Sequence, residues 1–95
     1  MPAKSIHKSE YLVLLRRLRA LRTAAGLTQV ALSAALQRPQ SYVSDVERGS
    51  RRMDLLQLRE FCNACEQSLT QFVDEFEQEL GQVRPARRPP KQPSL

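Results

Sequence analysis

The residues best suited to chemistry in this chain lie between Gln40 and Arg48. Val43 and Val46 in this segment are spaced so that, on a helix, both would turn inward. The outward face would then carry Gln40, Ser41, Tyr42, Ser44, Asp45 and Arg48. Nearly all of these side chains donate or accept hydrogen bonds, as the base edges in the major groove of DNA do. This face is therefore suited to reading bases.

A second set of residues, the motif Cys62-Asn63-Ala64-Cys65, could bind a metal or carry out redox chemistry. Zinc needs about four ligands, however, and the only histidine, His7, lies far away in the polar N-terminal segment. Both cysteines fall on the apolar side of a predicted helix. We therefore predict that they are core residues and that the chain binds no metal.

Four neighbouring carboxylates could suggest metal binding or acid–base catalysis: Asp74, Glu75, Glu77 and Glu79. They fall on the outer face of an amphipathic helix, where solvated charge is the simpler interpretation. The chain also has no set of nucleophile, base and oxyanion donors, and no glycine-rich phosphate loop. The sequence therefore predicts no enzymatic activity, no cofactor and no small-molecule substrate.

The elements that position these residues must fit within one domain, because the chain has 95 residues. Hydrophobic residues make up 41% of the chain, enough for a small core. No stretch approaches the roughly 18 apolar residues of a membrane span, and the N-terminus has no apolar signal segment. Two cysteines without a disulfide framework fit a reducing compartment. We therefore expect a cytoplasmic protein that does not interact with membranes.

The net charge of +5 is distributed unevenly along the chain. Residues 9–59 contain nine arginines and four acidic residues, whereas residues 60–83 contain six acidic residues and no basic one. This division favours one face for a polyanion and another for a different partner. The alternative is that unequal charge in a short chain reflects only solvated faces.

Apolar spacing predicts five helices and no strand, hence an all-α fold. The predicted helices cover residues 9–25, 29–36, 40–47 and 55–66, and a last segment from Ser68 or Thr70 to Leu80. The residues expected to cap or end them are Ser9, Gly26, Thr28, Gly49, Asp54 and Gly81. The inward residues of the fourth helix are Leu55, Leu58, Phe61, Cys62 and Cys65. Residues 9–83 form the predicted domain, between a flexible leader (1–8) and a disordered tail rich in proline and arginine (84–95).

Two runs of residues resemble parts of a known family. The first is Leu18-Arg19-Ala20-Leu21-Arg22, followed after three residues by Gly26-Leu27-Thr28-Gln29. The second is Gln40-Ser41-Tyr42-Val43-Ser44, followed after two residues by Glu47-Arg48-Gly49 and then, after two more, by Arg52. They resemble, respectively, the opening and the recognition helix of lambda-repressor-like (Cro/C1, XRE) DNA-binding domains. The resemblance extends from about Leu14 to Phe76 and implies a compact five-helix, helix-turn-helix domain that binds double-stranded DNA.

The resemblance also implies a role for each matching residue. Gln29 would contact phosphate and brace the recognition helix. Gln40, at the leading turn with Ser41, would contact a base, because a glutamine amide can pair with adenine N6 and N7. Tyr42 and Ser44 would reach phosphate or sugar, or in the case of Tyr42 a thymine methyl group. The residues that would hold the DNA backbone are Arg48, Ser50, Arg51 and Arg52. Arg38 is a further residue predicted to bind DNA.

Arg22 and Glu47 correspond to the structural ion pair that the family forms between its first and third helices. The sequence departs from the family pattern at four other positions. Gln37 replaces the glycine of the turn and would need a left-handed backbone. Pro39 replaces the usual Ser or Thr cap, and Ser33 stands where a packed alanine is common. Asp45 puts a negative charge on the reading face, which repels phosphate unless it accepts from cytosine N4.

The last helix carries a long apolar stripe, formed by Leu69, Phe72, Val73, Phe76 and Leu80. Either the whole stripe packs inward, or Phe76 and Leu80 meet a second copy in a homodimer that reads a palindromic site. We expect a sequence-specific transcriptional regulator, a repressor, that reads the major groove with the helix of residues 40–47. The alternative is an antitoxin-like interaction protein whose acidic last helix binds a protein partner, with DNA binding secondary.

Overall fold

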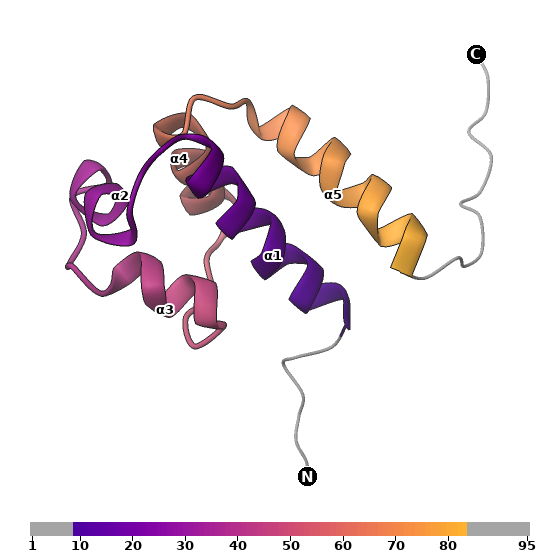
Figure 1. The fold of residues 1–95 in the computed structure, drawn as a ribbon, viewed down its shortest axis with the longest axis horizontal. Helices are drawn as coiled ribbons and strands as arrows, with labels where there is room; N and C mark the ends of the chain where they lie inside the picture. Colours follow the sequence, from indigo (N-terminus) through magenta and orange to yellow (C-terminus); the bar gives the residue numbers. More distant parts are fainter. Residues whose placement is uncertain (1–8, 84–95) are drawn as a thin grey trace, which may run out of the picture.

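The computed structural model describes residues 9–83, so our predictions for the leader (1–8) and the tail (84–95) lie outside the described residues. This part of the chain consists of five helices without a strand (Figure 1). They are α1 (Ser9–Ala24), α2 (Gln29–Ala35), α3 (Tyr42–Arg48), α4 (Leu55–Ala64) and α5 (Leu69–Val83). The prediction of an all-α fold with five helices is confirmed. Within this range, every helix is too short or too polar to cross a membrane.

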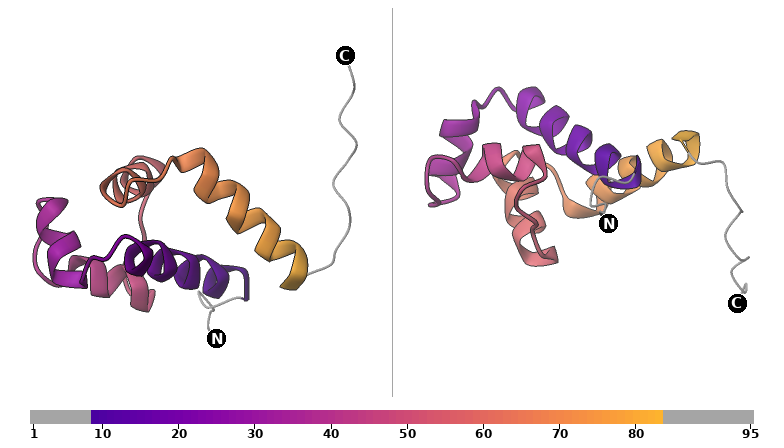
Figure 2. Two further views of the ribbon diagram at one scale, coloured as in Figure 1. Left: turned by 45° about the horizontal axis from the view of Figure 1, so that its top comes forward. Right: turned by 90° about the horizontal axis from the view of Figure 1, so that it is seen from below.

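One core joins the five helices. Helix α1 packs against α3 and α5, α2 packs against α3, and α4 packs against α5. The views in Figures 1 and 2 show α2 and α3 together at one end of the molecule and α5 running beside α1 in the opposite direction. The most deeply buried side chains come from every helix: Val13, Leu18, Leu32, Val43, Val46, Phe61 and Phe72. Each stabilises the fold by roughly 1.5–3 kcal/mol through burial, so α3 is anchored by the same core as the rest.

Three helices begin at side chains that supply the hydrogen-bond acceptor that a helix start needs. Thr28, Asp54 and Ser68 each accept from the backbone N–H three residues later, at 3.0, 2.8 and 3.0 Å. Gln57 also accepts from the backbone N–H of Asp54 at 2.9 Å, which completes a capping box. The predicted starts at Thr28 and Asp54 are confirmed, and Ser68 rather than Thr70 begins the last helix.

Some of the helices end where we predicted, and others do not. Gly26 and Gly49 follow α1 and α3 with φ of 78° and 85°, as expected for glycine stops. Helix α4 ends at Ala64, two residues before the predicted Glu66, because Glu66 has a left-handed φ of 62°, which was not predicted. The predicted stop at Gly81 is wrong, since α5 continues to Val83. Glycine permits a left-handed turn but does not impose one, and a helix tolerates it at a cost of about 1 kcal/mol.

The start of α4 lies farther from the core than we predicted. Leu55 is 66% exposed, so its assignment to the inward face is wrong. Leu56 beside it is also exposed, whereas Phe61 and Cys62 are completely buried. Leu58 packs against the core from a half-buried position. The inward face of α4 thus begins one turn later than its apolar pattern suggests, and two leucines remain at the surface.

Candidate nucleic-acid interface

The turn between α2 and α3 follows the predicted left-handed path. Gln37 has a φ of 58°, and its backbone N–H donates to the carbonyl of Ala34 at 2.9 Å. Helix α3 then starts at Tyr42, two residues later than predicted. Pro39 has no N–H, and its carbonyl accepts from the backbone N–H of Tyr42 at 2.9 Å, which closes a tight turn ahead of the helix. Gln40 therefore lies in the turn, where its side chain is exposed.

Helix α3 is held from below by α2. Val43 and Val46 are completely buried, as their spacing predicted. Ser33 of α2 is also completely buried, and its Oγ accepts a hydrogen bond from the backbone N–H of Val43 at 3.0 Å. Ser41 holds the N-cap position of α3, but its side chain makes no capping hydrogen bond, so Ser33 supplies an acceptor for this helix start from another helix. The sequence analysis did not predict this hydrogen bond, because it joins residues of two different helices.

A buried cluster of polar side chains joins α1, α2 and α3. Arg22 donates to both carboxylate oxygens of Glu47, at 2.7 and 3.1 Å, and to the carbonyl of Leu27 at 2.9 Å. Gln29 Nε2 donates to Glu47 at 2.9 Å, and the Nε atom of Arg19 lies 3.6 Å from the same carboxylate. The predicted ion pair of Arg22 with Glu47 and the bracing by Gln29 are thus present. Together they fix the rotation of α3 against α1.

The charge of Glu47 is stabilised by these partners. Burial alone would raise its pKa, but the hydrogen bonds from Arg22 and Gln29, with the charges of Arg22 and Arg19, outweigh it. The pKa of Glu47 therefore lies below its ordinary value of 4.5. The carboxylate remains ionised near neutral pH, and α3 stays attached to the body of the domain.

The opposite edge of α3 carries polar side chains toward solvent. Gln40, Ser41 and Arg48 are exposed, and Ser44 and Asp45 are half-buried. Arg48 forms an ion pair with Asp45, one turn earlier on the same helix. The Ser44 hydroxyl donates to the carbonyl of Ser41 at 3.1 Å. This edge can both donate and accept hydrogen bonds, and the pairing with Arg48 reduces the repulsion that Asp45 would exert on a phosphate.

Tyr42 does not lie on this outward edge, and our placement of its side chain there is wrong. It is only 3% exposed and belongs to the core cluster. The guanidinium carbons of Arg38 and Arg51 lie 5.0 and 5.1 Å from the centre of its ring. The physical reason is that the first residue of so short a helix lies next to both the preceding turn and the following loop. An aromatic side chain there gains more from being covered than from facing solvent.

The loop after α3 is short and basic. Ser50 donates from both its backbone N–H and its hydroxyl to the carbonyl of Asp45, at 3.0 and 3.2 Å. Arg51 and Arg52 are exposed, and the guanidinium of Arg52 lies 4.8 Å from the ring centre of Tyr11 on α1. Ser50, Arg51 and Arg52, which are all predicted to contact the DNA backbone, therefore lie together in the loop that follows α3. Helix α5, which contains Phe76 and Leu80, packs against α1, as α3 does, and lies on the other side of α1 from α3 (Figure 1).

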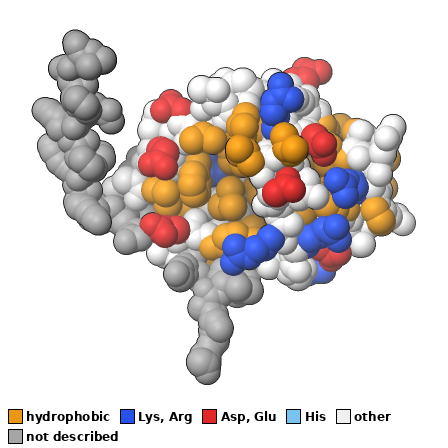
Figure 3. All heavy atoms as spheres, turned by 180° about the vertical axis from the view of Figure 1, so that it is seen from behind, with side chains coloured by type: hydrophobic (Ala, Val, Ile, Leu, Met, Phe, Trp, Pro, Cys, Tyr) orange, Lys and Arg blue, Asp and Glu red, His pale blue; other side chains and the backbone are white. Residues whose placement is uncertain are grey.

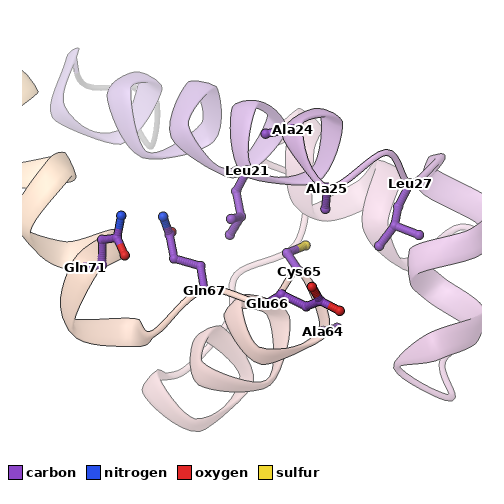
Figure 4. A pocket seen from close by; sticks show the side chains of 9 residues that line it. All are labelled: Leu21, Ala24, Ala25, Leu27, Ala64, Cys65, Glu66, Gln67 and Gln71. Atoms are coloured by element: carbon purple, nitrogen blue, oxygen red, sulfur yellow. The ribbon is translucent and has the colours of Figure 1, made fainter.

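The two cysteines lie away from this edge, in the core. Both are buried free thiols, as predicted for core residues. Figure 4 shows Cys65 below a hollow between the end of α1 and the turn from α4 to α5. Burial, with Cys65 beside it, raises the pKa of Cys62 to about 11, and burial also raises the pKa of Cys65. Protonated thiols are poor metal ligands, and residues 9–83 contain no group of three His, Cys, Asp or Glu side chains that could hold a metal.

Comparisons with known proteins agree with this geometry. Residues 13–72 match a family model described as a helix-turn-helix domain. Among solved structures, the chain is similar to an XRE-family like protein from Pseudomonas syringae pv. tomato str. DC3000, with 38% sequence identity and a TM-score of 0.71. The similarity covers 78% of this chain and 90% of that chain. A search of curated proteins gave no match. The segment matched by the family model includes α2, the turn and α3.

Proposed function

Because the chain belongs to the XRE-type helix-turn-helix family of DNA-binding regulators, we propose that it regulates transcription by reading a specific duplex sequence with α3 in the major groove. The observation that carries this proposal is the division of α3 into two sides. Val43, Val46 and Glu47 tie one side to the core, and the other side presents polar side chains to solvent. Such a helix is anchored to the domain and also presents hydrogen-bonding groups to solvent.

The proposed contacts divide into those that read bases and those that hold the backbone. Gln40 is the main candidate for a base contact, supported by its exposure at the leading end of α3, with Ser41 and Ser44 beside it. Asp45 would accept from cytosine N4 if Arg48 turned away to a phosphate. The residues proposed to contact the backbone are Gln29, Arg38, Arg48, Ser50, Arg51 and Arg52. Tyr42 is left out of the direct contacts because it is buried.

Selection from a pool of random duplexes, followed by affinity measurements on the selected sequence at several salt concentrations, tests this proposal. Arg52→Ala should weaken binding to selected and unrelated duplexes by a similar factor and reduce the salt slope by about 0.9. Gln40→Ala should instead change the preference at one base position, by about 1–3 kcal/mol. Arg59→Ala is the matched control, because Arg59 is exposed on α4 and has no proposed contact.

Failure would be visible in two ways. A selection that enriches no sequence would contradict specific recognition. A Gln40→Ala variant with unchanged base preference would mean that Gln40 does not read a base.

We further propose that the protein represses transcription, because a domain bound at a promoter excludes RNA polymerase. We also propose that it is located in the cytoplasm, in the same compartment as the DNA that it binds. Transcription in vitro from a template with the selected sequence should fall as protein is added.

We also propose that the protein binds as a homodimer through the C-terminal half of α5. Phe76 and Leu80 are only half-buried, and Val73 is 40% exposed. Hydrophobic side chains also gather on the face opposite to the view of Figure 1, with acidic side chains toward the end of α5 (Figure 3). Phe76→Glu should lower the mass measured by sedimentation without unfolding the domain. Leu56→Glu, on exposed α4 surface, is the control, and loss of the dimer in that variant alone would contradict the α5 interface.

Binding of a protein partner through acidic α5 is the alternative function, and the structure reduces the charge available for it. Glu75 and Glu79 are engaged by Arg17 and Arg16 of α1. Asp74 and Glu77 are the exposed carboxylates left on this helix. Co-purification of a second, basic chain that binding-site DNA does not displace would favour this alternative.

A further inference from the structure

We infer that Tyr42 is a positioning residue that holds Arg38 and Arg51 ready for DNA phosphates, an inference that rests on the proposed function. Arg38 belongs to the turn before α3, and Arg51 belongs to the loop after it. Their guanidinium carbons lie 5.0 and 5.1 Å from the centre of the same ring. Tyr42 therefore joins the two flanks of the reading helix without touching DNA itself.

The position of the ring makes it a suitable support. Tyr42 is the first residue of α3, is 3% exposed, and packs in the core cluster that also contains Val43 and Val46. Any movement of α3 relative to the core would therefore move the ring together with the reading edge. Arginines held by this ring keep a fixed position relative to Gln40 and the bases it would meet. The register between base contacts and backbone contacts would thus be set inside the protein.

Arg38 and Arg51 are held by an aromatic ring, unlike the arginines in the body of the domain. Arginines in the body of the domain are held by carboxylates, as Arg22 is by Glu47 and Arg17 is by Glu75. A carboxylate offsets the charge and occupies the N–H donors of its arginine. An aromatic ring attracts the cation but leaves its charge uncompensated and its edge donors free. Among residues 9–83, the one carboxylate that forms an ion pair with Arg38 is that of Glu60, at a distance of 4.0 Å.

A second ring repeats this arrangement. The guanidinium of Arg52 lies 4.8 Å from the ring centre of Tyr11. Within residues 9–83, the three arginines held over rings are all among those proposed to contact the DNA backbone. Each cation–π contact at an exposed site favours the held position by a factor of about two to five. Flexible arginines lose side-chain freedom when they bind phosphate, so a ring that orders them beforehand increases affinity.

A double-mutant cycle on the selected duplex, at one fixed salt concentration, tests this inference. Tyr42→Leu removes the ring and keeps an apolar side chain, and it should weaken binding about fivefold. In the Arg38→Ala/Arg51→Ala background, Tyr42→Leu should have almost no further effect on affinity. An equal loss in both backgrounds would overturn the inference, because it would mean that Tyr42 acts through the fold alone or contacts DNA directly.

Tyr42→Phe provides the conservative comparison. This variant keeps the ring and loses the hydroxyl, so it should retain most of the wild-type affinity. A loss as large as that of Tyr42→Leu would assign a direct contact to the hydroxyl and overturn the positioning role. The free energy of unfolding of each variant is measured in parallel. If Tyr42→Leu does not fold, the affinity of Tyr42→Phe and the NMR shifts of the Arg38 and Arg51 side chains test the positioning role instead.

NMR of the free wild-type protein supplies a test that needs no DNA. The side-chain protons of Arg38 and Arg51 should show upfield ring-current shifts relative to those of exposed Arg59. Tyr42→Phe should preserve these shifts. Unshifted protons on both arginines would overturn the inference whether or not the protein binds DNA. Conversely, shifted protons in a protein that binds no duplex would refute the proposed function and leave the geometry of the ring intact.

Discussion

Two regions of this small domain use the same pair of residue types, arginine on α1 and glutamate on another helix, in opposite environments. In the inner region, Arg22 meets Glu47 of α3, and their side chains are only 11% and 2% exposed. In the outer region, Arg16 and Arg17 meet Glu79 and Glu75 of α5, and these side chains are between 23% and 58% exposed. The ion pairs of the two regions contain the same chemical groups, so the regions differ in how far solvent reaches these groups.

The comparison shows that burial decides what an ion pair does. Removal from water costs several kcal/mol per ion, so a buried pair requires nearly every donor and acceptor to be satisfied. Glu47 accepts three hydrogen bonds, and Arg22 also donates to the Leu27 carbonyl. In the outer region, solvent and salt compete with each contact, and such pairs are worth about 0–1 kcal/mol. The inner pair therefore fixes α3 in place, whereas the outer pairs only assist the apolar packing of α5.

Removing the charge of Glu47 should produce the largest effect. Glu47→Gln leaves Arg22 without a counter-charge in a nearly dry site, and we expect a loss of about 3 kcal/mol in the free energy of unfolding. Urea denaturation followed by circular dichroism measures this loss.

The matched control for this variant is Asp45→Asn on the same helix. Asp45 is paired with Arg48 at the surface, so its replacement should change stability by less than about 0.5 kcal/mol. Equal losses of stability in the two variants would mean that the buried Arg22–Glu47 pair contributes no more than the exposed Arg48–Asp45 pair.

The pH dependence of stability sharpens the same point. The folded-state pKa of Glu47 lies below 4.5, because its hydrogen bonds and neighbouring arginines outweigh burial. The stability that this shift contributes is therefore complete above about pH 4.5 and is lost as the pH falls through the folded-state pKa. Wild type and Glu47→Gln should differ by a constant amount at neutral pH, and the difference should narrow in acid. A difference that widened in acid would mean that the pKa is raised in the folded state.

A neutral buried hydrogen bond in the inner region should have an intermediate effect. Ser33→Ala would leave the buried Val43 N–H without its acceptor, which should lower the free energy of unfolding by roughly 1–3 kcal/mol. Ser41→Ala is the control, because the Ser41 hydroxyl caps nothing and its side chain is exposed. Thermal unfolding of the two variants compares them directly. A Ser33→Ala variant as stable as wild type would show that water or another group replaces the serine.

The sequence predicted those parts of the structure that depend on local chemistry. Apolar spacing located the five helices, whereas the left-handed backbone at Gln37 followed from the family resemblance, which has a glycine at this turn. The family resemblance supplied the pairing of Arg22 with Glu47. Each of these depends on neighbours in the chain or on a motif, so a single sequence contains enough information to find it.

Features that depend on contacts across the fold were not predicted. Tyr42 was expected on the reading edge, but it packs in the core cluster, and the guanidinium groups of Arg38 and Arg51 lie over its ring. Leu55 fits the apolar stripe of α4, yet it is 66% exposed and lines an open hollow together with Tyr11 and Leu14 of α1. The bond from Ser33 to the Val43 N–H joins two helices, and helical periodicity carries no information about such a bond.

The smallest expected effect lies in the outer region, and it depends on salt. Glu75→Gln removes the 2.7 Å contact with Arg17, whose side chain is 28% exposed, and should cost less than about 1 kcal/mol at low ionic strength. The Debye length falls from about 10 Å at 0.1 M salt to about 3 Å at 1 M, so this loss should disappear at high salt. The loss in Glu47→Gln should persist there, because bulk ions do not enter a buried site. Urea titrations of both variants at the two salt concentrations make the comparison. A loss in Glu75→Gln that is independent of salt would mean that α5 is attached to α1 by a desolvated pair, as α3 is.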